Sequence, residues 1–520
     1  MNRREFSVAF GALALGAAAQ PGKLAAQTDS TDKTKDADKA KDAKKTPFSR
    51  NTVIAMAREM AKKPFDPPQP IPDNFANLNY DDHRKIRFKK DLALWAGNNR
   101  GFTVELLHAG FVVKSPVEIY KVEDGQAEQI TYSPDYFDFG DLKVRPPEGR
   151  PMFSGIRINA PINVLHHYDE VVVFQGASYF RGVGADQLFG ISARGLAIDT
   201  GEPTGEEFPF FRSFWIERPA VDSKTITVHA LLDSQSVTGA FTFVIRPGIS
   251  TVLDVESVLF CRADVKHLGL APLTSMYLFD GREKHRFDDF RPAVHDSDTL
   301  SIARNTGEWI MRPLANPEKL QISAFVEEDP IGFGLQQRER DYEDYKDLEA
   351  RYELRPSAWV EPKTPWKKGH VQLVEIPTDL EANDNIVVFW HPRKQLRKGQ
   401  ELRYAYWLTF GPPVINQRIA RVAESRMGMS VLRKHRQFIV DFNPPIENGV
   451  PVYLGSDVEP RVTASSGRIE HVVGRHNPMT GGYQVSFEMD TTDVELSELR
   501  LVLALEGEQI SETWLYRWTT

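Results

Sequence analysis

Carboxylates, aromatic rings and an arginine gather in three short stretches of the chain. The stretches are IPTDLEANDNIVVFW (376–390), DDFRPAVHDSDTL (288–300) and DLEARYELRPSAW (347–359). The side chains in them that could do chemistry are Asp379, Glu381, Asp384, His295, Asp296, Tyr352, Arg355 and Trp359. Two separated carboxylates can divide the work of glycoside cleavage, because one protonates the leaving oxygen while the other activates water. Aromatic faces stack on the apolar faces of sugar rings.

Ordinary structural roles explain the same residues equally well at this level. An acid before an apolar strand usually caps or turns the chain. Tryptophans in a β-sandwich are more often core residues than sugar platforms. Arg355 could simply pair with Glu353 or Asp347 on a solvated surface. The pattern alone therefore leaves carbohydrate chemistry and plain turn chemistry both open.

The sequence lacks the common motifs for phosphate binding, zinc binding and serine nucleophiles. It contains no GxxxxGK[ST] phosphate loop, no HExxH and no GxSxG. The 13 histidines are scattered, and neighbours such as His166 and His167 point to opposite faces of a strand. We therefore expect neither a metal nor a cofactor. The one cysteine, Cys261, excludes an intrachain disulfide and is expected to be a small buried hydrophobe.

Length and charge narrow the class of protein. A chain of 520 residues is too long for one core, so we expect two or more domains. The formal net charge of −8 disfavours nucleic acid, whose binding rests on basic patches. After the leader, no apolar run is long enough to span a membrane.

The N-terminal 46 residues read as two segments that precede the folded chain. Residues 1–26 have a charged start and an apolar centre, and Arg3-Arg4 followed by Phe6 indicates a twin-arginine signal for export to the periplasm. A plain secretory signal with an incidental arginine pair stays open. Residues 27–46 alternate lysine and aspartate with few apolar side chains, so we expect a disordered tether.

The rest of the chain predicts an all-β protein with a single long helix. Apolar residues recur at helical spacing from Ser49 to Lys62, and Pro64 ends that helix. Runs with period two, such as TITVHALL and AFTFVIR, continue to about residue 410. We expect a large β-sandwich over 47–410, a linker over 411–428, and a small immunoglobulin-like β-sandwich over 429–520.

Seven longer stretches resemble the periplasmic glucans biosynthesis protein family (OpgG/OpgD, also called MdoG/MdoD). They are YSPDYFDFGD (132–141), GASYFRGVGADQLFGISARGLAIDTGEPTGEEFP (176–209), APLTSMYLF (271–279), RPAVHDSDTLSI (291–302), TGEWIMRPL (306–314), DLEARYELRPSAWVEP (347–362) and LVEIPTDLEANDNIVVFW (373–390). The resemblance runs from about residue 47 to the C-terminus. Together with the twin-arginine leader, it favours the D member.

The resemblance implies a fold, an activity and a set of roles. The large sandwich should be galactose-mutarotase-like, and the activity an inverting endo-β-1,2-glucanase. Asp384 would be the general acid with Glu381 beside it, and Asp296 would stand at the base end of the water path. The implied substrate-binding residues are Tyr352, Arg355, His295 and Trp359.

Two other functions remain open at this stage. One is a transglycosylase that branches or cyclises the same β-1,2-glucan, and the other is a non-catalytic glucan-binding scaffold. The expected partners are the glucan and a membrane glucan synthase. An exposed sandwich edge could also pair with a second copy of the chain.

Overall fold

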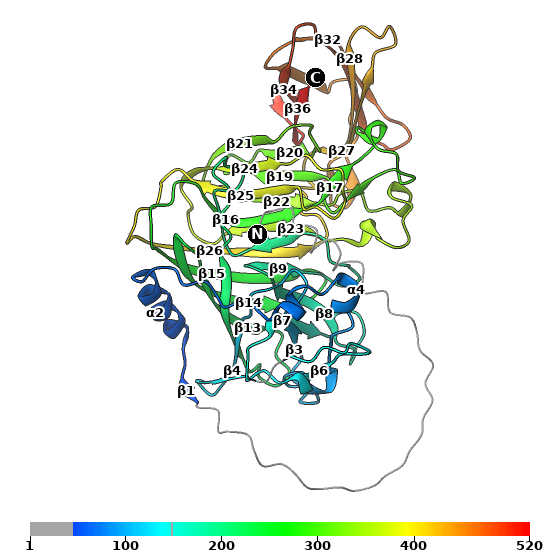
Figure 1. Ribbon diagram of the computed structural model, residues 1–520. Helices are drawn as coiled ribbons and strands as arrows, with labels where there is room; N and C mark the ends of the chain where they lie inside the picture. Colours follow the sequence, from blue (N-terminus) through cyan, green and yellow to red (C-terminus); the bar gives the residue numbers. More distant parts are fainter. Residues whose placement is uncertain (1–44, 147–148) are drawn as a thin grey trace, which may run out of the picture.

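The computed structural model describes residues 45–146 and 149–520. The predicted leader (1–26) lies outside the described residues, as does the predicted tether (27–46) except for its last two positions. Across the described residues the chain is almost entirely strand, as Figure 1 shows, so the predicted all-β class is confirmed.

Two large sheets face each other and enclose the main core. The order in the first sheet is β1-β5-β4-β12-β13-β14-β15-β26-β23-β22-β19-β20-β36-β34-β31, with β35 on β34. Its strands are β1 (Thr46–Pro47), β4 (Glu118–Glu123), β5 (Gln126–Gln129), β12 (Phe210–Glu217), β13 (Ile226–Asp233), β14 (Val237–Arg246), β15 (Thr251–Cys261), β19 (Thr299–Ala303), β20 (Trp309–Pro313), β22 (Gly332–Gln336), β23 (Ser357–Pro362), β26 (Glu401–Gly411), β31 (Glu459–Ala464), β34 (Leu496–Leu505), β35 (Glu508–Gln509) and β36 (Thr513–Thr519).

The second sheet has the order β21-β24-β25-β16-β10-β9-β8-β7-β3, with β11 on β16. Its strands are β3 (Thr103–His108), β7 (Phe153–Ala160), β8 (Asp169–Gln175), β9 (Tyr179–Gly182), β10 (Ser192–Arg194), β11 (Ala197–Ile198), β16 (Leu268–Ser275), β21 (Gln321–Glu328), β24 (Lys368–Glu375) and β25 (Ile386–Pro392). Phe174 of this sheet meets Phe243 of the first sheet with ring centroids 5.0 Å apart. The predicted large β-sandwich is therefore confirmed.

Period-two patterning explains how the strands build this core. Ile226, Val228 and Ala230 of β13 are all buried, as the alternation in TITVHALL predicts. Burying apolar surface in this way stabilises the fold by about 25 cal/mol per Å². Cys261 is buried at the end of β15, and burial raises the pKa of its thiol to about 11. Its predicted role as a small buried hydrophobe is confirmed.

Short helices and two-stranded ribbons lie around the sheets. The helices are α2 (Arg50–Ala61), α3 (Asp73–Ala76) and α4 (Tyr80–His83), and the 3₁₀ turns are η1 (Lys90–Leu92), η2 (Pro134–Tyr136), η3 (Lys284–Arg286), η4 (Tyr342–Asp344) and η5 (Tyr352–Leu354). The ribbons are β2 (Arg87–Phe88) with β6 (Phe137–Asp138), β17 (Tyr277–Phe279) with β18 (Val294–His295), and β29 (Ile446–Glu447) with β30 (Val450–Pro451). Helix α2 confirms the helix predicted from Ser49, and its buried face packs on Trp215 and Phe260 of the first sheet.

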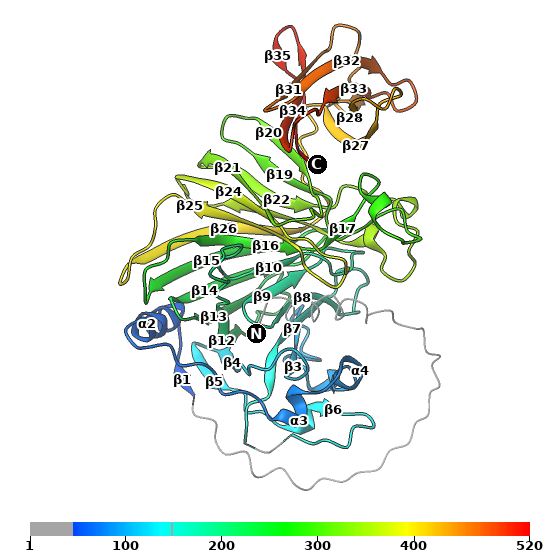
Figure 2. The ribbon, with the colours of Figure 1, turned by 45° about the horizontal axis from the view of Figure 1, so that its top comes forward.

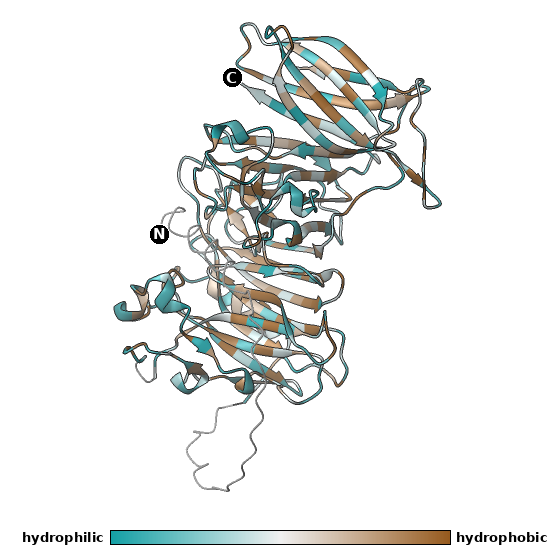
Figure 3. Cartoon of the chain, turned by 90° about the vertical axis from the view of Figure 1, so that its right-hand side faces the viewer, coloured by the Kyte–Doolittle hydropathy of each residue, from teal (hydrophilic) through white to brown (hydrophobic). Residues whose placement is uncertain are grey.

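A second, smaller sandwich forms the C-terminal end of the molecule, seen at the top of Figure 2. It places β36, β34 and β31 against a sheet of order β27-β28-β33-β32, with β27 (Arg421–Met429), β28 (Arg436–Asn443), β32 (Arg468–His476) and β33 (Tyr483–Asp490). Figure 3 shows hydrophobic and hydrophilic residues alternating along these strands. Seven antiparallel strands in two layers confirm the predicted immunoglobulin-like sandwich.

The boundary between the two sandwiches differs from the prediction in two respects. The C-terminal sandwich begins at Arg421, inside the predicted linker, because 421–429 is strand β27. This strand has only Val422 fully buried and a register irregularity after it, so its sequence lacks clear alternation. In addition, β20 pairs in parallel with β36, so the first sheet runs continuously from one sandwich into the other.

Candidate active site

Four neighbouring strands of the second sheet bring their ends to one place. Ile386 at the start of β25 pairs with Ser275 at the end of β16, and Ser192 of β10 pairs with Arg181 of β9. Strands β16 and β10 are themselves paired at this level. Asp384, two residues before Ile386, therefore lies at the sheet end that also carries Arg181.

Arg181 joins the two predicted catalytic carboxylates electrostatically. Its Nη2 lies 3.9 Å from Asp384 Oδ2, and each of the two side chains keeps only 9% of its surface exposed. Its Nε donates to Ser192 Oγ at 2.7 Å. Burial lowers the pKa of Arg181, while the charges of Asp384 and then of Asp296 oppose that shift. The structure thus brings both carboxylates within the field of one buried guanidinium.

Asp296 is held by Arg355, as the sequence prediction grouped them. It follows β18, is 5% exposed, and its backbone N–H donates to the carbonyl of Met276 at 2.8 Å. Its carboxylate accepts a short hydrogen bond from Arg355 Nη1. Burial opposes the charge of Arg355, but the neighbouring Asp296 outweighs it and raises the pKa of the guanidinium. The same guanidinium lies 4.3 Å from the ring centroid of Tyr352, so three predicted site residues form one cluster.

The turn that carries Asp384 is fixed next to β25 by Asn385. The Asn385 side chain accepts from the backbone N–H of Tyr277 at 2.8 Å and donates to the carbonyl of Ile376 at 3.1 Å. The Ile376 N–H returns a bond to the Asn385 carbonyl at 2.9 Å. The second asparagine of EANDN therefore closes the turn.

Asn316, in the segment after β20, fixes the other end of the same turn. Its side chain accepts from the Thr378 N–H at 3.0 Å and donates to the carbonyls of Thr378 and Leu278 at 2.8 and 2.9 Å. Thr378 Oγ1 in turn accepts from Asn383 Nδ2 at 2.9 Å. The carboxylate of Asp384 is thus presented by a turn that is hydrogen-bonded on both sides.

Glu381 lies at the edge of this site and is bound to an arginine. Its Oε2 accepts from Arg291 Nη2 at 2.6 Å, and 37% of its side chain is exposed. Arg291 also donates to Asp347, which accepts from the Ala350 N–H, and the Ala350 carbonyl accepts from Arg355 Nη2 at 3.2 Å. The structure therefore places Glu381 with the other predicted residues, at the exposed rim.

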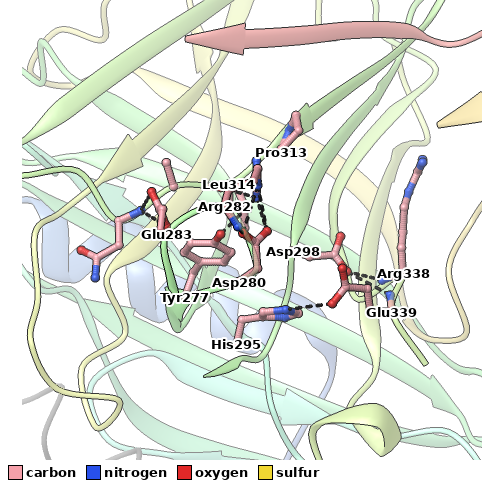
Figure 4. A network of polar contacts seen from close by, with 12 residues as sticks. Tyr277, Asp280, Arg282, Glu283, His295, Asp298, Pro313, Leu314, Arg338 and Glu339 are labelled. Atoms are coloured by element: carbon pink, nitrogen blue, oxygen red, sulfur yellow. Dashed lines mark hydrogen bonds and ion pairs between the residues drawn. The ribbon is translucent and has the colours of Figure 1, made fainter. Parts of the chain in front are cut away.

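His295 points away from this cluster into the interior, although it neighbours Asp296 in sequence. It is fully buried and stacks on Tyr277 with ring centroids 5.6 Å apart, an arrangement visible in Figure 4. Its Nδ1 hydrogen-bonds to Gln337 Oε1 at 2.9 Å, and its Nε2 lies 3.5 Å from Glu339 Oε2. Burial opposes protonation, but Glu339 outweighs it and raises the pKa of His295 to about 9.

Trp359 is also an interior residue. It is 2% exposed and stacks on Trp309 with ring centroids 5.7 Å apart. A sugar ring stacks only on exposed aromatic surface. Trp359 and His295 are buried, so neither offers such a surface to a substrate. The structure gathers Asp384, Asp296 and Glu381 with Tyr352 and Arg355, and leaves these two outside.

A buried ionic network lies behind Asp296 and reaches the C-terminal sandwich. The backbone N–H groups of Arg338 and Glu339 donate to Asp298 Oδ2 at 2.6 and 3.1 Å. The Arg338 guanidinium, labelled in Figure 4, binds the fully buried Glu512 at 2.7 and 2.9 Å. Glu512 also accepts from the Val422 N–H at 2.9 Å.

Two arginines, Arg181 and Arg291, belong to the site and were missed by sequence reasoning. Both lie in stretches that carry the family resemblance. Arg181 carries an additional signal, because it stands in YFRG, an otherwise uncharged strand in which Phe180 faces the core. A charge in such a strand needs a buried partner.

The candidate site does not coincide with the cavity of about 530 Å³ in this structure. That cavity lies beside α2, lined by residues that include Met60, Arg212 and Arg262, and it contains none of the site residues. Among residues 45–146 and 149–520, no group of three or more His, Cys, Asp or Glu side chains is arranged to hold a metal ion.

Known proteins similar to this chain share one description. The family model "Periplasmic glucan biosynthesis protein, MdoG" matches residues 48–518. Glucans biosynthesis protein G of Vibrio cholerae (strain ATCC 39541) is 46% identical over 478 residues, covering 91% of this chain and 87% of the relative. The protein of that name from Rhodopseudomonas palustris (strain CGA009) is 44% identical over the full length of both. These names do not support the predicted preference for the D member.

Solved structures give only distant similarity. A galactose mutarotase related enzyme from Lactobacillus acidophilus aligns with 46% of this chain and 96% of its own, at 8% identity and a TM-score of 0.21. In the part of the chain that the model describes, no helix is both long and apolar enough to cross a membrane.

Proposed function

Because the chain belongs to the MdoG family of periplasmic glucan biosynthesis proteins, we propose that it hydrolyses the β-1,2-glucan backbone from within, with inversion. Asp384 is the general acid and Asp296 the base end of the water path. The observation that carries this proposal is that two mostly buried carboxylates from different loops each lie against a buried guanidinium. Asp384 lies 3.9 Å from Arg181, and Asp296 accepts from Arg355. An inverting site needs two such groups on opposite sides of the scissile bond.

Asp384 suits the acid role because its turn is rigid and its side chain is mostly buried. A cation 3.9 Å away favours the ionised carboxylate, whereas a general acid must hold a proton. Binding of the glucan therefore has to loosen the Arg181 contact and place the glycosidic oxygen against Asp384. The proton then leaves Asp384 for the departing sugar oxygen as the C–O bond breaks.

Asp296 suits the base end of a relay rather than direct contact with water. One of its oxygens is occupied by Arg355, and only 5% of the residue is exposed. A substrate hydroxyl or a bound water therefore passes on the proton that the attacking water loses. Arg355, packed against the Tyr352 ring, keeps the carboxylate in place, while Glu381 lies partly exposed at the edge of the site and binds Arg291.

The experiment incubates the purified mature protein with linear β-1,2-glucan and follows reducing ends, chain lengths and the anomeric form of the product. Wild type should release new reducing ends with inverted configuration. Asp384→Asn and Asp296→Asn should each lose at least about a hundredfold in rate, since both remove a proton-transfer group. Asp379→Asn is the matched control, because Asp379 is an exposed acid of the same turn, and its rate should stay within about twofold.

Two other outcomes would replace hydrolysis with a different function. Redistributed or cyclised chains at a constant number of reducing ends would establish transglycosylation by the same residues. Binding of unchanged glucan by wild type would leave a non-catalytic scaffold, which would serve a membrane glucan synthase. A glucan that is cleaved equally well by Asp384→Asn would contradict the assignment of the acid.

Family membership gives the protein its role in periplasmic glucan biosynthesis, and we further propose export by the twin-arginine route. The support is the Arg3-Arg4 pair followed by Phe6. Replacing both arginines with lysine keeps the charge and should leave the protein in the cytoplasm. Normal periplasmic recovery of that variant would instead establish an ordinary secretory signal.

The predicted homodimer is tested by sedimentation of the mature chain.

A further inference from the structure

Three large apolar side chains stand exposed at the tips of three loops near the candidate site. They are Phe290, Leu348 and Leu380, which are 80%, 76% and 58% exposed, and we call them the apolar rim. Single exposed apolar residues are common on protein surfaces. These three are unusual because each directly neighbours, in sequence, a residue of one ionic cluster.

That cluster is centred on Arg291, which ties the three loops together. Its Nη2 donates to Asp289 at 2.7 Å and to Glu381 at 2.6 Å, and its Nη1 donates to Asp347 at 3.1 Å. The three carboxylates come from the loop at 280–293, the turn at 376–385 and the loop at 337–356. These loops extend from the large sandwich near β17 in Figure 2.

The ring of Phe290 is held in a definite orientation despite its exposure. The Arg291 guanidinium lies 5.5 Å from the ring centroid, within the range of a cation–π contact. Burial lowers the pKa of Arg291, but its hydrogen bond to Asp289 has the larger effect and raises it. The guanidinium therefore stays charged. Only 9% of Arg291 is exposed, so its position is set by the three loops. An exposed aromatic ring thus lies beside a buried guanidinium that three loops hold in place.

The rim is continuous with the candidate site through Glu381. This residue stands three positions before Asp384 in the same turn and accepts from Arg291. Arg291 also binds Asp347, whose loop accepts from Arg355 at the Ala350 carbonyl. Arg355 holds Asp296. The loop of Phe290 leads directly into β18 and Asp296. The turn of Leu380 carries Asp384, so the apolar rim borders the loops of both proposed catalytic carboxylates.

We propose that the apolar rim is a subsite that binds the apolar face of a glucose unit near the cleavage point, with Phe290 as the stacking platform. Arg291 is a positioning residue that holds the platform and the turn of Asp384 in register. This inference rests on the proposed function, since it takes the glucan as the ligand. A sugar ring has one apolar face and a hydroxyl edge, which matches an aromatic face bordered by the charged atoms of Arg291 and Glu381.

The test measures binding of linear β-1,2-glucan by calorimetry in the Asp384→Asn background, so that no turnover occurs. Adding Phe290→Ala should weaken binding about tenfold, because one face of the ring no longer covers the sugar. Adding Phe290→Tyr should leave the affinity within about twofold, because the aromatic face is kept. Tyr453→Ala is the matched control, since Tyr453 is a 70% exposed ring of the C-terminal sandwich.

The outcomes separate the rim from the proposed function. Glucan that binds equally well with and without Phe290 would overturn the rim while leaving the glucanase intact. Equal losses in the Phe290 and Tyr453 variants would overturn the assignment of the platform to this position. Absence of glucan binding in the Asp384→Asn protein and in wild type would overturn both proposals together. A loss confined to Phe290→Ala, restored in Phe290→Tyr, establishes the subsite.

Discussion

At the scale of single residues, Arg181 decides how the two carboxylates can share protons. It is a buried cation 3.9 Å from Asp384. Burial lowers its pKa, and the charges of Asp384 and Asp296 oppose that shift. A fixed positive charge favours the ionised form of the carboxylate beside it, here Asp384. We expect this residue to set the pH at which the site works, in addition to holding the carboxylates in place.

Replacing Arg181 with glutamine should therefore change the pH dependence as well as the rate. The rate of glucan cleavage should fall roughly 10- to 100-fold, as expected for loss of a charged group from a preorganised site. The basic limb of the pH–rate profile, where the general acid loses its proton, should move to higher pH because the cation no longer favours the carboxylate. Arg181→Lys keeps the charge and should keep that limb in place. Equal profiles for the glutamine variant and wild type would mean that Arg181 is only structural.

His295 makes a second prediction, concerning stability. Burial opposes its charge, yet Glu339 raises its pKa to about 9 from an ordinary value of about 6.5. A histidine whose pKa is higher in the folded state stabilises the fold below about pH 6.5, and this contribution disappears as the pH rises through 9. Between pH 6.5 and pH 9.5 the free energy of unfolding should thus fall by on the order of 3 kcal/mol.

Thermal melts at these two pH values check this, with His295→Gln as the comparison. The variant should be less stable than wild type at pH 6.5, and its stability should change less between the two values. A decrease of the same size in both proteins would show that other groups cause it.

At the scale of elements, the turn at 376–385 depends on residues far away in the sequence. The side chain of Asn316 makes three hydrogen bonds, two to Thr378 and one to Leu278, and Asn316 is fully buried. Removing a buried amide leaves several polar groups without partners, each at a cost of about 1–3 kcal/mol. The turn of Asp384 then has one anchor, at Asn385, instead of two.

Asn316→Ala should consequently lower stability by about 2–4 kcal/mol and lower kcat for glucan cleavage more than it raises KM. Denaturant unfolding and initial rates measure the two effects. Asn305→Ala is the control, because Asn305 is an exposed asparagine whose side chain makes one hydrogen bond, to Glu328. A kcat equal to that of wild type would show that Asn385 alone positions the turn.

The elements themselves were largely predictable from sequence, whereas the contacts between them were not. Period-two alternation revealed β13, β14, β28, β33 and β34, because each buries one side of a strand. The sequence predicted a linker where strand β27 lies. A strand is recognised in sequence by alternating apolar and polar residues, and β27 lacks this alternation because little of it is buried. Asp384, Asp296, Tyr352 and Arg355 stood out by residue type and spacing, and the family resemblance supplied their roles. Arg181 and Asn316 act through partners that only the folded chain brings close.

At the scale of the whole molecule, the two sandwiches are joined by backbone as well as by side chains. Strand β36 of the C-terminal sandwich pairs with β20 of the large one, and Glu512, just before β36, binds Arg338. Arg338 also donates through its backbone to Asp298, two residues from Asp296. The C-terminal sandwich therefore supports the segment that carries the proposed base end, and its contribution should be measurable at this ion pair.

Glu512→Gln keeps the size of the side chain and an acceptor for the Val422 N–H, but it leaves the buried Arg338 without its charge partner. Breaking a buried pair from one side costs about 3–5 kcal/mol, mostly because the remaining charge is uncompensated. Combining Glu512→Gln with Arg338→Met removes that charge, so the double variant should be more stable than the sum of the single effects by at least about 1 kcal/mol. Calorimetric unfolding of the four proteins gives this coupling directly. Strictly additive effects would mean that this ion pair does not stabilise the contact between the sandwiches, because an ion pair that does so must show coupling.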